Sequence, residues 1–515
     1  MSKFSISRRE FIGATAVLGI QVALNPGTSF GQDAAGLPQS LATNPRLSMW
    51  VRMSADGQVT IATGKAELGQ GIGTALAQIA ADELDVAIER INVSKPDTAD
   101  SPNEGRTIGS LSIQHSGSAI RIAAAEARGL LLANAARQLD VRPDALEVAD
   151  GVIGSTDGRS VTYWQLLADT QFDTDVSGTF APKSTDTYRY VGHSQPRRDL
   201  PAKFFGGEAY LQDIRLAGML HARIVRPHNP PARLIATDTD TVEAMAGVVR
   251  VVRNGSFLAV VAEREEQAIA AAARLRDVSE WEQARALPAP GEFPSLLQQL
   301  ESESEVIFER GESTHGGREF TAEYSRPYTA HASISPSAAV ARFVDSILTV
   351  WTHSQGVFEL RGALATILGM PESQIRCIHV PASGCYGQNG ADDAGCDAAM
   401  IAMTMPGRAI RLQWSRQDEF RYEPYGSAML LRVAARVNAD NRIADWDYDL
   451  WSCTHSTRPA GGATAGNLLA AREKANPLSE SPRYNMRQPT GGADRNAIAL
   501  YAFPYQRVTK HFVTD

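Results

Sequence analysis

Two stretches of this chain run from a strand pattern through a glycine-rich loop into a helix pattern, and they constrain the fold most. In the first, the alternating run QVTIAT leads into GKAELGQGIGTALAQI at residues 64–79. In the second, IRCIHV leads into SGCYGQNGADDAGCDAAMIAM at residues 383–403. Strand and helix patterns that alternate in this way predict a mixed α/β architecture.

The first glycine loop does not fit the dinucleotide fingerprint G-x-G-x-x-G. Counted from Gly69, the third glycine position holds Thr74; counted from Gly71, it holds Leu76. A nicotinamide site is therefore disfavoured. The free N–H groups at a helix start can still bind a phosphate or a polar heterocycle, and a tight turn without a ligand is the alternative.

A second loop, PNEGRTIGSLS at residues 102–112, precedes the long helix pattern RIAAAEARGLLLANAARQL. Thr107, Ser110 and Ser112 place three hydroxyl groups on this glycine-interrupted loop. Hydroxyl groups in such a loop suit phosphate oxygens.

A length of 515 residues exceeds what one hydrophobic core supports and suggests about three domains. The formal net charge of -8, without a basic stripe, argues against a nucleic-acid surface.

The first 31 residues have the form of an export signal. Lys3, Arg8 and Arg9 precede an apolar run over residues 11–24, which is too short to span a bilayer, and no other apolar run approaches that length. The SRREFI sequence at residues 7–12 is typical of the twin-arginine pathway, which exports folded proteins. We expect a soluble periplasmic protein that folds around a cofactor before export; an ordinary signal with two chance arginines is the alternative.

Three folded segments follow the signal. The first covers residues 48–185, and the second, residues 197–285, contains a compact α+β pattern at about 203–282 that could fold as an independent module. A linker rich in Pro, Glu and Ser runs from 286 to 313, and the third segment covers 315–515. After Trp451 the pattern becomes irregular, and no closing element is expected at HFVTD.

The chain has four cysteines and no C-x-x-C pair, so the sequence indicates neither an iron–sulfur cluster nor a structural zinc site. Their spacings select no disulfide pairing, and buried free thiols are the favoured interpretation. The four are Cys377, Cys385, Cys396 and Cys453.

Taken together, the two loops resemble those of the molybdopterin-binding large subunit of the xanthine dehydrogenase family. The similarity is to the branch that holds the large subunit of isoquinoline 1-oxidoreductase and the B subunit of nicotinate dehydrogenase. GGEAYLQDIRLAGMLHARIVRP resembles the family's α/β hammerhead module, and residues 351–400 with QWSRQDEFRYEPYG resemble its first molybdenum-cofactor domain. The resemblance implies cofactor-binding domains with a hammerhead between them, in an α+β or mixed α/β multidomain fold.

The resemblance also implies a chemistry. A molybdenum–molybdopterin cofactor, in bacteria usually the cytosine dinucleotide, serves to oxidise an aldehyde or N-heteroaromatic substrate with water as the oxygen source. Electrons leave through [2Fe–2S] clusters, which the cysteine pattern assigns to a separate small subunit, with a cytochrome c as a possible further partner.

Carried over position by position, the resemblance assigns residues to the cofactor but none as a protein ligand to the metal. Gln355 matches a glutamine near the metal's oxo group, and Gly-Cys-Tyr-Gly stands where many relatives have Gly-Gly-Phe-Gly. Cys385 is interpreted as small filler or as a redox-active thiol. The assigned residues are Gly69, Gln70, Gly71, Thr107, Ser110, Ser112, Gln355, Gly384, Cys385, Tyr386 and Gly387.

Other polar residues have weaker assignments. Asp392 and Asp393 either polarise a substrate nitrogen or are solvated or helix-capping carboxylates. His331 is expected to be a packing histidine, and neither His115 nor His353 has metal-like spacing. Arg416, Asp418 and Glu419 are expected to form a structural ion-pair turn.

One family feature has no counterpart in this sequence. The family's catalytic base is a glutamate in a Gly-x-Gly-Glu segment near its C-terminus, so the catalytic residue is unknown here. Three hypotheses follow: a second polypeptide supplies that half, the chain is truncated and inactive, or it is a non-enzymatic periplasmic binding protein.

Overall fold

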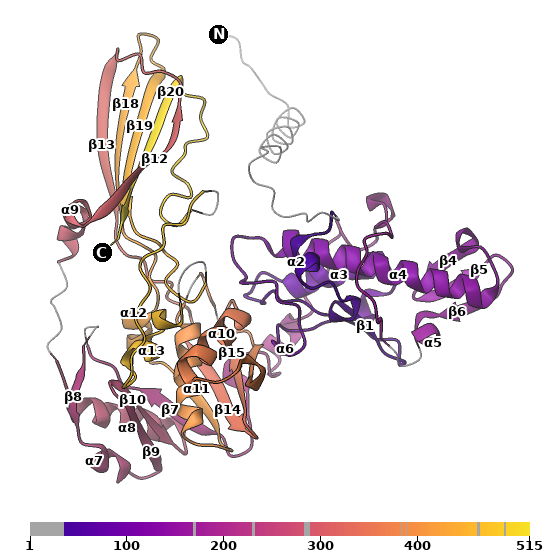
Figure 1. Ribbon diagram of the computed structural model, residues 1–515, viewed down its shortest axis with the longest axis horizontal. Helices are drawn as coiled ribbons and strands as arrows, with labels where there is room; N and C mark the ends of the chain where they lie inside the picture. The colour runs from indigo at the N-terminus through magenta and orange to yellow at the C-terminus, as the bar shows by residue number, and fades with distance from the viewer. Residues whose placement is uncertain are drawn as a thin grey trace.

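The computed structural model describes residues 36–167, 171–228, 232–282, 289–382, 384–387, 389–460, 464–488 and 491–514 (Figure 1). The predicted export signal lies outside these residues. No helix in the described part is long and apolar enough to cross a membrane.

The N-terminal domain is built on two long helices, α3 (Ile72–Leu84) and α4 (Ser118–Leu139), which pack against each other. Trp50, Leu76 and Ile120 lie in its buried core. Short helices and two three-stranded sheets complete it, namely α2 (Gln39–Thr43), β1 (Val51–Met53), β2 (Val59–Ile61), β3 (Ile91–Val93), β4 (Leu146–Ala149), β5 (Val152–Ser155), β6 (Ser160–Thr162) and α5 (Tyr163–Leu167).

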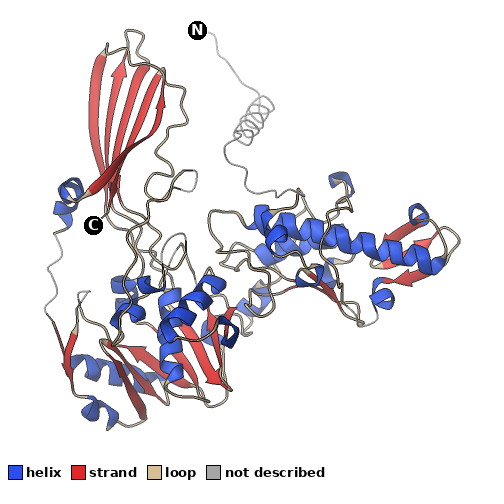
Figure 2. Ribbon diagram, in the orientation of Figure 1, coloured by secondary structure: helices blue, strands red, loops and turns tan. Residues whose placement is uncertain are grey.

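A seven-stranded sheet forms the centre of the rest of the molecule (Figure 2). Its order joins strands from both the predicted hammerhead and the third segment: β16 (Ile375–His379), β15 (Ile347–Thr352), β14 (Ala338–Val344), β17 (Ala409–Gln413), β7 (Leu220–Ile224), β10 (Phe257–Ala262) and β9 (Val248–Asn254).

The expectation of an independent module at about 203–282 is therefore wrong. β7 pairs in parallel with β17, with Leu220 opposite Ile410, so the two segments share one sheet. All six residues of β10 are buried, which is typical of a central strand covered on both faces. Within residues 203–282, the elements that lie outside this sheet and follow β7 are β8 (Leu234–Thr237), α7 (Thr239–Glu243), α8 (Glu265–Asp277) and β11 (Ser279–Trp281).

Helices α10 (Val357–Leu368) and α11 (Ala391–Met403) cover the sheet, with α10 against β16 and α11 against β14 and β15. All residues of α11 up to Ala402 are buried, so this helix is the core of the domain. Short helices lie around it, namely α6 (Leu200–Phe204), α9 (Phe293–Gln299), α12 (Arg416–Tyr422) and α13 (Leu469–Glu473).

A second, five-stranded sheet extends away from this body (Figure 1). Its strands, in order, are β12 (Ser302–Arg310), β20 (Tyr505–Val513), β19 (Ile443–Ser452), β18 (Met429–Val437) and β13 (Arg318–Arg326).

Two expectations are corrected by this sheet. The predicted linker 286–313 contains the edge strand β12, whose glutamates and serines are mostly exposed. The predicted irregular end forms β20, an inner strand between β12 and β19. Gln506 and Lys510 alternate with Val508 and Phe512 at buried positions of β20, so polar residues hid the strand pattern.

Candidate functional site

The first glycine loop binds a carboxylate of its own chain. Glu67 accepts backbone hydrogen bonds from Gly69 at 2.9 Å, Gly71 at 3.0 Å and Gly73 at 3.3 Å. Its negative charge also faces the positive end of the α3 dipole. The N–H groups of all three glycines are thus occupied, and the loop does not present an open phosphate cradle.

A chain of hydrogen bonds joins three of the segments that the sequence assigned to the cofactor. Gln70 Nε2 donates to the Ala66 carbonyl at 2.8 Å, and the Ala66 N–H donates to Thr107 Oγ1 at 2.8 Å. The Thr107 N–H donates to the Gln355 carbonyl at 2.9 Å, and Gln355 Nε2 donates to the Thr107 carbonyl at 2.9 Å. Residues far apart in the sequence therefore meet at one place.

The loop at residues 102–112, here called the hydroxyl loop, keeps two hydroxyl donors available. Ser110, exposed and held at φ 61°, and the half-buried Ser112 form no side-chain hydrogen bond with any residue that the structure describes. A Cβ on Gly109 would lie 3.8 Å from Nη2 of Arg495. This exposed guanidinium from residues 491–497 was not assigned from sequence, because nothing local links GGADRN to a loop so much earlier in the chain.

The 384–387 loop presents an aromatic side chain and hides its thiol. Tyr386 is 60% exposed and is held at φ 54°. Cys385 is buried and its Sγ donates to the Gly387 carbonyl at 2.6 Å, while burial raises the pKa of the thiol. Of the two interpretations of Cys385, small filler fits this environment better than a redox-active thiol.

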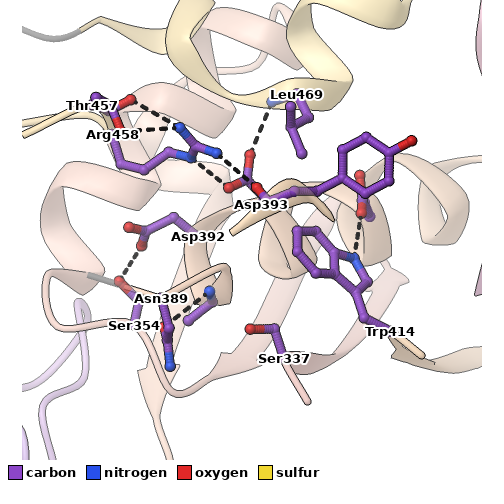
Figure 3. Close-up of polar contacts among 12 residues, drawn as sticks. Ser337, Ser354, Asn389, Asp392, Asp393, Trp414, Thr457, Arg458 and Leu469 are labelled. Carbon is purple, nitrogen blue, oxygen red and sulfur yellow. Dashed lines mark hydrogen bonds and ion pairs between the residues drawn. The ribbon is translucent and has the colours of Figure 1, made fainter. Parts of the chain in front are cut away.

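Aspartates at the start of α11 connect this loop to the hydroxyl loop. Asp392 is buried and accepts from the Ser354 hydroxyl (Figure 3). It also lies 3.7 Å from Arg106, the neighbour of Thr107. Burial raises the pKa of Asp392, which Arg106 opposes. Asp392 is therefore not a solvated carboxylate; it lies in the first turn of α11, where a carboxylate favours the helix start, and the substrate-polarising role stays a prediction.

Asp393 and Asp397 form further buried ion pairs from the same helix. Asp393 accepts from Arg458 and from the Leu469 N–H (Figure 3). Asp397 accepts from Arg226 at 2.7 and 3.0 Å. Asp393 is therefore not a solvated carboxylate either, and α11 binds arginines from separate parts of the chain.

Two buried histidines support the site. His379 Nδ1 lies 3.0 Å from the Ser354 carbonyl, and Nε2 lies 3.2 Å from the Glu67 carbonyl in the N-terminal domain. Burial lowers the pKa of His379 to about 4 and that of His353 to about 3. As a neutral ring, His379 lies at the domain boundary and can donate to only one of these two carbonyls, a position for which the sequence carried no signal.

The turn predicted at Arg416, Asp418 and Glu419 is structural, but the ion pair expected in it is wrong: among the described residues Arg416 donates to the Ser333 and Ile334 carbonyls and the two acids accept from serines. Glu419 accepts from the Ser337 N–H at 2.7 Å and from its hydroxyl at 3.0 Å, and Asp418 accepts from the N-cap Ser415 of α12. Burial raises the pKa of Glu419 to about 7.

The other interpretations from sequence are partly confirmed. All four cysteines are free thiols, and three are buried while Cys453 is half buried. The ring of His331 packs against Gly387, and its Nδ1 has no hydrogen bond among the described residues, so it is a packing histidine but not a fully satisfied one.

Comparisons with known proteins point to one family. Residues 15–203 and 305–475 each match a family of molybdopterin cofactor-binding domains. The chain is 34% identical to the B subunit of nicotinate dehydrogenase from Pseudomonas putida, over 99% of its length and 42% of the relative's. It is 27% identical to the beta subunit of isoquinoline 1-oxidoreductase from Brevundimonas diminuta, over 85% of its length and 63% of the relative's.

Among solved structures, the aldehyde oxidoreductase of Desulfovibrio gigas matches with 19% identity and a TM-score of 0.48, over 64% of this chain and 39% of that one. The chain thus spans less than two thirds of the length of these relatives. The two domain matches and the two curated relatives agree with one another. The chain belongs to the xanthine dehydrogenase family of molybdopterin-binding subunits, in the branch of nicotinate dehydrogenase and isoquinoline 1-oxidoreductase.

Proposed function

We propose that this chain is the large subunit of a molybdenum hydroxylase that oxidises an aldehyde or an N-heteroaromatic compound with water as the oxygen source. The observation that carries the proposal is the hydrogen-bonded chain from Gln70 through Thr107 to Gln355. It brings together three segments that the family resemblance assigns to the molybdopterin. The hypotheses of an inactive or non-enzymatic protein have no comparable support.

The residues at this place fit a molybdopterin, which we propose to be the cytosine dinucleotide form. Ser110 and Ser112 offer hydroxyls without a partner among the described residues, and Arg495 offers an exposed guanidinium, which together suit phosphate oxygens. Glu67 fills the glycine loop, so that loop would contribute its shape and the position of Gln70 rather than free N–H groups. When bound, the cofactor supplies a metal centre for two-electron oxidation.

This chain's own residues would bind and orient that group. Thr107 and Gln355 fix each other through paired backbone and side-chain hydrogen bonds, so the hydroxyl loop is held before a ligand arrives. The buried Arg106–Asp392 pair fixes the same loop against α11, which begins shortly after Gly387. No described residue is assigned as the catalytic base.

The partners are proposed from the relatives, which are named as subunits. A small subunit with [2Fe–2S] clusters would accept the electrons, because the four cysteines here are dispersed and largely buried. A cytochrome c subunit, and a second polypeptide that completes the cofactor site, are further proposed partners.

Molybdenum content tests the proposed function. Elemental analysis of the protein isolated from its native host is expected to give about one molybdenum per chain, together with co-purifying partner subunits. Protein with molybdenum near zero under molybdate-sufficient growth would contradict the proposal and favour a non-enzymatic role.

Gln355→Ala is expected to lower molybdenum per chain about tenfold, because it removes the side-chain hydrogen bond that fixes Thr107. Gln70→Ala should act in the same direction, since its amide spans Ala66 and Leu68. Gln298→Ala, on the exposed side of α9, is the matched control. Wild-type molybdenum content in both site variants would contradict the assigned site.

We also propose that the protein is exported to the periplasm by the twin-arginine pathway. Arg8→Lys combined with Arg9→Lys is then expected to leave uncleaved precursor in the cytoplasm, measured by fractionation and immunoblotting. Lys3→Gln, which keeps both arginines, should be exported normally. Normal export of the double variant would contradict this route.

A further inference from the structure

A cavity of 370 Å³ lies where four parts of the chain meet. These are the glycine segment with the start of α3, the end of β3 with the following residues 94–96, the connecting segment 198–209 that contains α6, and His379 with Pro381. None of the residues assigned to the cofactor lines it, but Lys65, Glu67 and Gly73 of the same glycine segment do. The cavity therefore lies beside the proposed molybdopterin site.

Polar groups without partners face this cavity. Ser94 Oγ is buried and has no hydrogen-bond partner in the described part of the protein. The Lys95 ammonium forms neither a hydrogen bond nor an ion pair with any described residue. A buried hydroxyl without a partner costs free energy that a bound acceptor would relieve, and the exposed Lys95 is free to pair with an anion.

The other lysines and arginines of the cavity already have partners. Lys203 Nζ pairs with Asp199 at 2.6 Å, and Lys65 Nζ donates to the Glu104 and Arg106 carbonyls at 2.6 and 3.2 Å. Arg198 donates to the Ile91 carbonyl. Lys95 is thus the cation of this lining that has neither a hydrogen bond nor an ion pair among the described residues.

No carboxylate of the described residues neutralises Lys95. Partial desolvation and the nearby Lys203 both lower the pKa of Lys95, so its surroundings disfavour the unpaired ammonium. Glu208, exposed at the rim, is not within ion-pair distance of either lysine. An anion beside Lys95 would supply the missing counter-charge.

Apolar side chains form part of the wall, beside the carboxylate residues Glu67, Asp199 and Glu208. Ile72, Val93, Pro96, Ala202 and Pro381 line the cavity. Their presence disfavours a fully hydrated ion such as inorganic phosphate and suits a ligand with an apolar body.

We infer that this cavity binds a small organic carboxylate, with its carboxylate group at Lys95 and Ser94 and its apolar body against Ile72, Val93 and Pro381. The site joins the N-terminal domain to the connecting segment and to the end of β16, so occupancy would strengthen the contact among these parts. This inference does not depend on molybdenum or on the proposed reaction.

Titration calorimetry on the full chain tests the inference with benzoate, and with benzamide and inorganic phosphate as comparison ligands. Benzoate is expected to bind saturably, at least tenfold more tightly than either comparison ligand. Lys95→Gln should weaken benzoate binding at least tenfold, Ser94→Ala by several-fold, and Lys95→Arg should retain most of it.

The matched control is Arg142→Gln, which removes one exposed positive charge from the β4–β6 end of the N-terminal domain and should leave benzoate binding unchanged. Absence of saturable benzoate binding, equal affinity in Lys95→Gln, or tighter binding of phosphate than of benzoate would each overturn the inference. The Lys95 ammonium makes no contact with the described residues that folding would require, so Lys95→Gln is expected to fold as the wild type.

Discussion

Replacement of Arg226 by methionine is expected to lower the free energy of unfolding of the domain formed by the seven-stranded sheet and α11 by about 3–5 kcal/mol. Arg226 is 1% exposed, and its guanidinium binds Asp397 through two hydrogen bonds and Glu473 through two more. Arg226→Met leaves the fully buried Asp397 carboxylate with only the Trp414 N–H as a side-chain partner among the described residues. Urea unfolding followed by Trp414 fluorescence measures the change.

The matched control is Arg432→Met, which breaks an exposed Arg432–Glu323 pair in the five-stranded sheet and should cost less than about 1 kcal/mol. The double variant Arg226→Met with Asp397→Leu should recover part of the loss, because it removes the unpaired charge. Equal destabilisation by Arg226→Met and Arg432→Met would show that the buried pair has no special role.

The sequence predicted elements well and their association poorly. The apolar runs of β7, β10, β14 and β15 identify strands by local pattern alone. Their membership in one sheet depends on the parallel pairing of β7 with β17, which joins residues distant in the chain, such as Leu220 and Ile410, and leaves no local signal. For the same reason the hammerhead could not be recognised as part of a shared sheet.

In the site, too, the sequence predicted individual residues better than the contacts among them. Thr107 and Gln355 were assigned from sequence, and the structure places them in direct hydrogen bonding. Glu67 stood within the quoted glycine segment but was not recognised as the loop's own anion, since side-chain direction is not encoded in the motif. The solvated interpretation of Asp392 and Asp393 was wrong, because buried and exposed aspartates look alike until their arginines are located.

Two buried ionisable groups beside the seven-stranded sheet, His379 and Glu419, have opposite effects on how stability depends on pH. His379 has a folded-state pKa of about 4, below the ordinary value of 6.5, so the unfolded chain binds more protons between these pH values and stability falls as pH falls. Glu419 has a folded-state pKa of about 7, above its ordinary 4.5, so the folded chain binds more protons and stability falls as pH rises from 4.5 to 7. In the wild type these effects oppose each other.

Single replacements are expected to reveal each effect. His379→Gln keeps an amide donor for the Glu67 or Ser354 carbonyl but cannot titrate, so the stability of the wild type relative to this variant should fall by about 3 kcal/mol between pH 6.5 and pH 4. Glu419→Gln should give the opposite sign, with the wild type losing stability relative to the variant from pH 4.5 to pH 7. Urea unfolding at matched ionic strength measures both. If the difference in unfolding free energy between wild type and His379→Gln did not depend on pH, His379 would take up its proton equally in the folded and unfolded chain. The interpretation of His379 as a neutral ring at the domain boundary would then be wrong.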